Sequence, residues 1–152
     1  DGTQFVFPEL LFDDQQARAY LQVADLVTLQ YQVLTAPEEN ANDTAVVWHP
    51  DGRHIGISRR FLGGDRATPG QQIFLLDTAD GSLDPLVFDS DYFHGVFSWS
   101  PDGDLLVLQR YETDTRTQLA TGGIVTEIWV YDMDSRALTR IAEDAYQPLF
   151  VP

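Results

Sequence analysis

Apolar and polar residues alternate along much of this chain, and the same alternation returns at nearly equal distances. The recurring pairs are Phe5 and Phe7, Ile55 and Ile57, and Leu106 and Leu108. Alternation with a period of two is typical of β-strands that bury one face and expose the other. The pattern therefore predicts at least three equivalent strands.

A short turn motif precedes these strands and repeats with them. Residues 48–52 read Trp-His-Pro-Asp-Gly and residues 99–103 read Trp-Ser-Pro-Asp-Gly, an offset of 51 (99 − 48 = 51). The same step leads on to Phe150, and the chain begins with Asp1-Gly2. Proline presets φ, aspartate bonds back to the backbone and glycine accepts a positive φ, so each copy predicts a hairpin turn. The structural turn residues are Pro50, Asp51, Gly52, Pro101, Asp102 and Gly103.

These repeats divide the chain into three modules within a single segment, residues 1–152, at approximately 1–50, 51–101 and 102–152. In the second module we expect strands at residues 45–48, 53–59, 71–76 and 82–88. A further match, Ile-Phe-Leu-Leu-Asp at 73–77 against Ile-Trp-Val-Tyr-Asp at 128–132, extends the scheme to the third module. Four short antiparallel strands per module indicate an all-β protein built from β-propeller blades, about three in number.

The first module is the most degenerate. We expect strands at residues 3–7, 18–25 and 28–35, with an irregular link over residues 8–14. A helix across residues 14–34 is the rival interpretation, because Gln, Ala and Leu are good helix formers. At the other end, residues 147–151 are expected to form a lone innermost strand.

The turn motif and the Ile-aromatic-Val/Leu strand resemble the TolB-type, WD-like propeller repeats of bacterial proteins. The resemblance is strong from Val46 to Pro152 and weaker before that. It implies a propeller that is most often six-bladed, of which this chain would form half, and an extracytoplasmic location, whether periplasmic, secreted or cell-surface. It implies little about function, because propellers serve many unrelated tasks.

Charge and composition narrow the classes of partner. The chain has 9 basic and 24 acidic residues, for a formal charge of −15, and no cysteine. Such an acidic protein lacks the positive footprint that nucleic acids and anionic membranes require. No apolar run approaches the roughly 20 residues of a membrane-spanning helix, and we expect no membrane insertion and no cofactor.

The blade scheme places the tight Pro-Asp-Gly turns on one rim and the longer connections on the other, at residues 8–17, 36–44, 60–70, 89–94, 112–123 and 142–146. Function resides more often on elaborated loops, so the long-loop rim is the predicted binding face. The candidate binding residues are Tyr92, Phe93, His94, Arg59, Arg110 and Tyr111. For His94 the alternative is packing beside Gly95 with a bond to a loop carbonyl. For Arg59 and Arg110, which lie 51 residues apart, the alternative to a binding role is structural pairing with Asp or Glu.

Catalysis is not indicated. Ser98 and Ser100 lie outside any Gly-x-Ser-x-Gly setting, and the three histidines show no metal-ligand spacing. The acidic turn residues Asp77, Asp80, Asp132 and Asp134 lack a complete calcium-loop pattern. We therefore predict no catalytic residue and no metal site.

Two function classes follow. The first is a non-enzymatic scaffold that binds a protein, peptide or glycan on the long-loop rim. The second is the propeller portion of a larger enzyme, such as a prolyl-oligopeptidase-like peptidase, whose gene would continue into a Gly-x-Ser-x-Gly domain. Three blades would leave unpaired edges, so we expect the ring to be completed by a second copy or by another segment.

Overall fold

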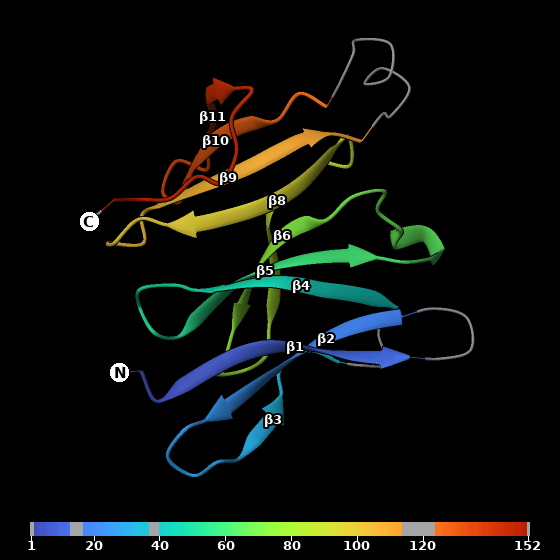
Figure 1. The fold of residues 1–152 in the computed structure, drawn as a ribbon, viewed down its shortest axis with the longest axis vertical. Helices are drawn as coiled ribbons and strands as arrows, with labels where there is room; N and C mark the ends of the chain where they lie inside the picture. Colours follow the sequence, from blue (N-terminus) through green and yellow to red (C-terminus); the bar gives the residue numbers. More distant parts are fainter. Residues whose placement is uncertain (1, 13–16, 37–39, 114–123, 152) are drawn as a thin grey trace.

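The protein is an all-β structure of three antiparallel sheets that follow one another along its long axis (Figure 1). A computed structural model describes residues 2–12, 17–36, 40–113 and 124–151. The first sheet has three strands, β1 (Gln4–Phe12), β2 (Ala17–Asp25) and β3 (Tyr31–Val33). The second has four, β4 (Ala41–Trp48), β5 (His54–Phe61), β6 (Gln72–Asp77) and β7 (Leu83–Val87). The third also has four, β8 (Tyr92–Trp99), β9 (Leu105–Glu112), β10 (Glu127–Asp132) and β11 (Leu138–Glu143).

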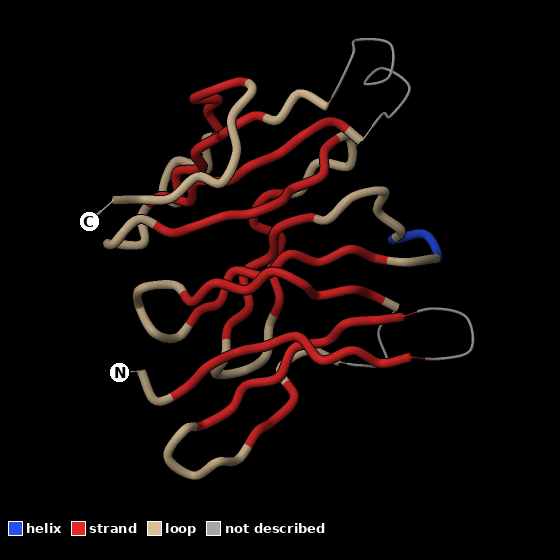
Figure 2. Tube along the Cα trace, viewed as in Figure 1, coloured by secondary structure: helices blue, strands red, loops and turns tan. Residues whose placement is uncertain are grey.

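Each sheet is a meander in which consecutive strands are neighbours, with β4 and β8 at one edge of their sheets and β7 and β11 at the other. The fold is therefore that of propeller blades, and the all-β, blade-like fold class is confirmed. Among the described residues the helical structure is a single 3₁₀ turn, η1 (Gly64–Arg66), between β5 and β6 (Figure 2). No helix in this part of the chain has the length and apolar character needed to cross a membrane.

Two apolar cores lie between the three sheets, because each strand of the middle sheet turns alternate side chains to its two neighbours. The core between the first and second sheets contains Leu21, Ala41, Ile55, Ile57, Phe61, Phe74 and Leu76. The core between the second and third contains Ile73, Val87, Phe97, Trp99, Leu106, Leu108 and Tyr131. The alternating residues Ile55, Ile57, Leu106 and Leu108 thus lie in these cores, whereas in β1 Val6 packs against the first core and Phe5 is exposed.

The repeated turns join the first strand of a blade to the second, as predicted. Gly52 and Gly103 have φ of +71° and +85°, and Gly2, at the start of the first module, has φ of +74°. The Asp51 carboxylate accepts hydrogen bonds from the backbone N–H groups of Arg53 (2.8 Å) and His54 (2.9 Å). Glycine reaches this region of φ without strain. The shared positive φ shows that the three positions are equivalent in structure as well as in sequence.

Several predicted loops are strands, and the helical alternative is wrong. β1 continues to Phe12, where an irregular link was expected, and β2 and β3 occupy residues where the rival helix was placed. β4 and β8 begin earlier than expected, at Ala41 and Tyr92, beyond register shifts at 43/46 and 94/97. These irregularities break the alternation, which is why the sequence looks like a loop there. Parts of the expected loops at 8–17, 36–44 and 112–123 lie outside the described residues.

The two repeated tryptophans differ in environment. Trp99 is buried between the second and third sheets, and its indole Nε1–H donates to the Val47 carbonyl at 3.3 Å. Trp48 is only half-buried, and its Nε1 is a buried atom for which the described residues provide no hydrogen-bond partner. The counterpart of the Val47 acceptor for Trp48 would lie 51 residues before Val47, which is outside residues 1–152.

The tail differs from the expectation. Residues 145–151 contain no strand in the part of the chain that the structure describes, so the predicted lone strand at 147–151 is not formed here. The backbone N–H of Gln147 donates to the Gln109 side-chain oxygen at 3.0 Å, but no described strand pairs with the tail. A strand needs a partner edge, and the described residues offer none to this segment.

Candidate functional site

The blades have two rims, and the tight turns share one of them. The 77–82 turn contacts the Pro-Asp-Gly turn of the same blade, since Arg53 donates to Asp77 and Thr78 donates to the Arg53 carbonyl at 2.7 Å. The opposite rim carries η1, the start of β8 and the ends of β9 and β10 nearest residues 113 and 124 (Figure 1). The long-loop rim of the sequence prediction corresponds to this second face.

Arg110 is the centre of the long-loop rim in the third sheet. Its guanidinium carbon lies 3.7 Å from the ring centroid of Tyr92 and 3.7 Å from that of Trp129, so the cation is held between two aromatic faces. The Arg110 Nη1 atom lies 3.6 Å from an Asp89 carboxylate oxygen, and its Nε atom lies 3.8 Å from a Glu127 carboxylate oxygen. Attraction between a cation and aromatic faces is strengthened by burial, and the Arg110 side chain is almost fully buried.

Phe93 and Tyr111 form a second aromatic pair at the adjacent positions of the same two strands, where side-chain alternation turns them to the other face of the sheet. They are cross-strand partners on β8 and β9, and their rings stack 4.9 Å apart at 15°. Both side chains are half-buried. The structure thus brings Tyr92, Phe93, Arg110 and Tyr111 together at one rim, with Trp129 as a member that the sequence reasoning did not select. Its position in the Ile-aromatic-Val strand made it look like a core residue.

His94 lies beneath this surface and is fully buried, with an exposed fraction of 0%. Its Nδ1 lies 3.1 Å from the Gln71 carbonyl, so Nδ1 carries the proton. Burial lowers the pKa of His94 to about 4, and the positive charge of Arg110 acts in the same direction. The packing alternative considered for His94, a bond to a carbonyl outside its own strand, describes its contacts.

Arg59 is the equivalent of Arg110 in the second sheet, yet its surroundings differ. Its Nε and Nη2 donate to the two carboxylate oxygens of Asp43 at 2.6 and 2.8 Å, and both residues are buried. A bidentate pair of this kind is a strong, directional contact. Arg59 therefore has the structural pairing named as its alternative, and it lies on β5, away from the Arg110 cluster.

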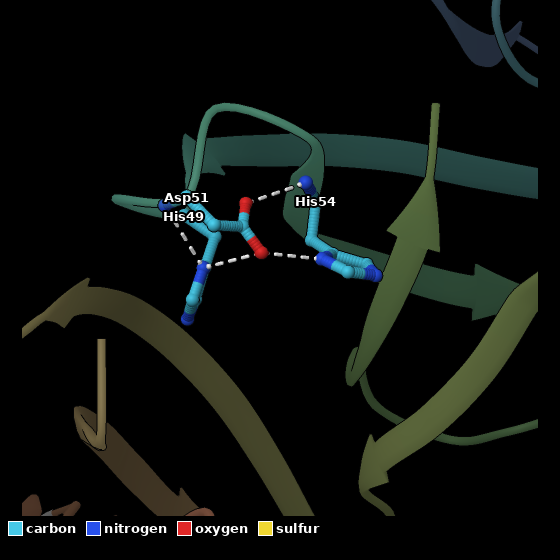
Figure 3. Close-up of side chains that lie close together, drawn as sticks. All are labelled: His49, Asp51 and His54. Atoms are coloured by element: carbon cyan, nitrogen blue, oxygen red, sulfur yellow. Dashed lines mark hydrogen bonds and ion pairs between the residues drawn. The ribbon is translucent and has the colours of Figure 1, made fainter. Parts of the chain in front are cut away.

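A different cluster lies on the short-turn rim of the second sheet, where His49, Asp51 and His54 converge (Figure 3). The Asp51 Oδ2 atom is 3.0 Å from His49 Nδ1 and 2.6 Å from His54 Nδ1. Burial alone would raise the pKa of Asp51, but the backbone N–H groups of His54 and Arg53 and the two imidazoles beside the carboxylate hold that pKa well below its usual range. The sequence reasoning missed this cluster, although four residues separate His49 from His54, a spacing that lies within the range used by zinc sites. The signal was that both histidines flank one Pro-Asp-Gly turn.

No family model and no curated protein matches this chain. Solved structures do match. A putative TolB from Agrobacterium tumefaciens superposes with a TM-score of 0.69 at 20% identity, over 93% of this chain and 46% of that one. TolB from Acinetobacter baumannii gives 0.63 at 18% identity, over 91% of this chain and 29% of that one. The propeller domain of the Trilobed protease from Pyrococcus furiosus, described as having an open velcro topology, gives 0.61 at 17% identity, over 93% and 39%.

These likenesses show the fold, which is that of a TolB-like β-propeller. The resemblance read from the turn motif is confirmed at this level. The chain spans less than half the length of the TolB structures that it matches. What it binds, and whether it works as part of an enzyme, are matters for a proposal.

Proposed function

We propose that this chain is a non-enzymatic propeller scaffold that binds a protein, or a peptide or glycan, on its long-loop rim. The observation that carries the proposal is that Tyr92, Arg110 and Trp129 pack together at the same rim as the stacked Phe93 and Tyr111. Tyr, Trp and Arg are the residues most enriched where binding energy concentrates in protein interfaces. We call these five residues the aromatic cluster.

The aromatic cluster is also preorganised. Arg110 is held by both rings and by two carboxylates, and Glu127 in turn accepts a hydrogen bond from the Trp129 indole at 2.8 Å. Arg140 donates to the other Glu127 oxygen at 3.0 Å. A partner that binds here loses little side-chain freedom, which favours affinity.

The test uses the half-buried members, because replacing the buried His94 or Arg110 would also disturb folding. A partner captured with the wild-type chain would be purified, and its affinity measured for wild type and for the Tyr92→Ala/Tyr111→Ala variant. Hot-spot truncations cost about 2 kcal/mol or more, so we expect affinity to fall about 30-fold or more. Asp80→Ala on the opposite rim is the matched control. Unchanged binding in the double variant would count against the proposal.

A second candidate function, the propeller portion of a larger enzyme, is favoured by other structural neighbours. They include an oligogalacturonate lyase in complex with manganese and the tricorn protease, of which the chain covers 39% and 12%. The decisive observation is the full gene: a continuation into a Gly-x-Ser-x-Gly domain supports this candidate over the scaffold.

The scaffold proposal includes completion of the ring by a second copy. No described strand pairs with the edge of β1 that faces away from β2, whereas the equivalent edge of β5 pairs with β4. At the same place no described residue accepts the buried indole N–H of Trp48. Leu149 lies two module lengths after Val47 in the sequence. The tail at 147–151 of another copy would therefore supply both the strand that pairs with β1 and the carbonyl that accepts the Trp48 N–H. The extracytoplasmic location implied by the TolB resemblance belongs to this proposal as well.

Light scattering coupled to size exclusion tests the completion. We expect a species of at least twice 17.1 kDa, because unpaired edges and exposed apolar residues such as Phe12 and Leu149 favour association. A folded, monodisperse monomer would contradict it. Should a different segment of the gene supply the missing strand, adding that segment would convert the assembly to a one-to-one complex.

A further inference from the structure

The short-turn rim of the second sheet carries three metal-type donors that no part of the proposed function uses. His49 and Asp51 lie in the β4–β5 turn, and His54 is the first residue of β5. Their side chains turn toward one another (Figure 3), and one donor atom from each lies within 4.8 Å of the other two. Donor atoms at about 2.0–2.2 Å from a tetrahedral ion stand roughly 3.3 Å apart. The His49–Asp51 separation of 3.0 Å is close to that value.

The hydrogen bonds of His49 decide which of its nitrogens is free to coordinate. Its Nε2 lies 3.1 Å from the Gly103 carbonyl, which can only accept, so Nε2 carries the proton. In the neutral ring Nδ1 then carries a lone pair, which accepts the Asp51 backbone N–H at 3.3 Å and lies 3.0 Å from the Asp51 carboxylate. A metal ion bound at Nδ1 would replace that backbone contact.

His54 is arranged in a complementary way. Its Nδ1 faces Asp51 Oδ2, and its Nε2 lies 3.8 Å from a carboxylate oxygen of Asp77. A carboxylate behind the second nitrogen orients a ligating histidine and favours the tautomer that leaves the first nitrogen free. Asp51 is fixed as well, since its other oxygen accepts two backbone N–H groups.

We propose that His49, Asp51 and His54 bind a divalent transition-metal ion such as Zn²⁺ on the short-turn rim. Two imidazoles and one carboxylate suit zinc, nickel or copper rather than calcium, which prefers oxygen donors. Three protein ligands leave a coordination position for water, and the Asp51 side chain is 37% exposed, so the site opens to solvent. The ion would bind beside the next blade, because the His49 ring also packs against Trp99 at a centroid distance of 4.8 Å.

The third sheet offers a matched control within the same chain. Its turn keeps Asp102 but has Ser100 and Leu105 in place of the two histidines, and Ser100 bonds Asp102 instead. Asp51→Asn and Asp102→Asn therefore make the same change in equivalent turns, only one of which has the donor set.

The experiment is titration of the intact chain with Zn²⁺ by calorimetry, with Ni²⁺ quenching of tryptophan emission as a second signal. We expect saturable one-to-one binding in wild type and in Asp102→Asn. Loss of a ligand should weaken binding by more than the 10- to 100-fold typical of an outer-shell change, so Asp51→Asn should lose it. Zinc should also relieve the nickel quenching.

Three results would overturn the proposal: no saturable binding in wild type, binding unchanged in Asp51→Asn, or equal loss in both Asn variants. If Asp51→Asn fails to fold, His54→Leu carries the same test, because leucine is the residue found at the equivalent position 105. Retained binding in a folded His54→Leu chain would likewise contradict the site.

Discussion

The second and third sheets place an arginine at the same position of the same strand, but they compensate its charge differently. Arg59 pairs across the strands with Asp43, and Arg110 pairs with His94 at the equivalent position. In the second sheet the neighbour is a carboxylate that bonds the guanidinium through both oxygens. In the third the neighbour is an imidazole whose depressed pKa keeps it neutral near pH 7, and the guanidinium turns to the rings of Tyr92 and Trp129.

The difference shows how one residue changes the use of a repeated position. In the second module Asp43 bonds the arginine through both carboxylate oxygens inside the sheet. In the third module the equivalent residue is His94, which supplies no charge, and Arg110 contacts the rings of Tyr92 and Trp129 and the carboxylates of Asp89 and Glu127 instead.

The largest effect should come from breaking the pair in the second sheet. Removing one partner of a buried ion pair leaves an uncompensated charge and costs about 3–5 kcal/mol. We expect Asp43→Ala to lower the free energy of unfolding by this amount in urea titration. The control is Asp43→Leu with Arg59→Met, which removes both charges and should recover most of the loss. A double variant as unstable as the single one would show that packing, not charge, dominates.

A loss of stability of similar size is expected for one of the two repeated tryptophans and not for the other. Trp99 is buried in the core between sheets and hydrogen-bonded, so Trp99→Ala should cost about 3–5 kcal/mol. Trp48 is half-buried and no described residue accepts its N–H, so Trp48→Ala should cost clearly less in the isolated chain. Denaturant unfolding of the two variants measures the difference. A loss below about 1 kcal/mol for Trp99→Ala, typical of surface substitutions, would contradict its role.

The smallest effect concerns pH and the third sheet. The unfolded chain protonates His94 below its ordinary pKa of about 6.5, whereas the folded chain does so only near 4. Stability from this group is therefore complete above about 6.5 and is lost as pH falls toward 4. Between about pH 7.5 and 5 the loss should be about 2 kcal/mol. The charged groups facing His94 are Arg110, which opposes protonation, and Asp89, which favours it.

The pH prediction is checked by urea titration at both pH values for wild type and His94→Gln. His94→Gln should lose most of the pH dependence of the unfolding free energy over this interval. Asp43→Asn is the control, because it removes no histidine and should keep that pH dependence. A pH dependence that is the same in wild type and His94→Gln would assign it to other groups.

The sequence predicted the blades because their determinants are local. Gly52 and Gly103 can adopt a positive φ within a four-residue turn. The apolar residues Ile55, Ile57, Leu106 and Leu108 recur at every second position, which is visible in the sequence alone. Strand ends were predicted less well, since bulges after Asp43 and His94 interrupt the alternation while pairing continues.

The site residues were harder to predict because their contacts cross strands or turns. Trp129 reaches Arg110 only through the pairing of β9 with β10, and apolar periodicity places it in the core. His49 and His54 meet only once the turn is closed. The six rim candidates were selected from loop position, and the structure divides them into half-buried aromatics and buried His94, Arg59 and Arg110. Their role in binding remains a prediction.

The hydrogen bond from the Trp99 indole to the Val47 carbonyl has a consequence for how such an array can grow. The donor belongs to the repeated turn motif of one module and the acceptor to the backbone of the module before it. A duplicated module therefore brings its own donor and finds an acceptor that any sequence provides. Gene duplication can lengthen the array without a compensating mutation at the new junction, and the number of blades is then decided by the angle between neighbours at which the circle closes.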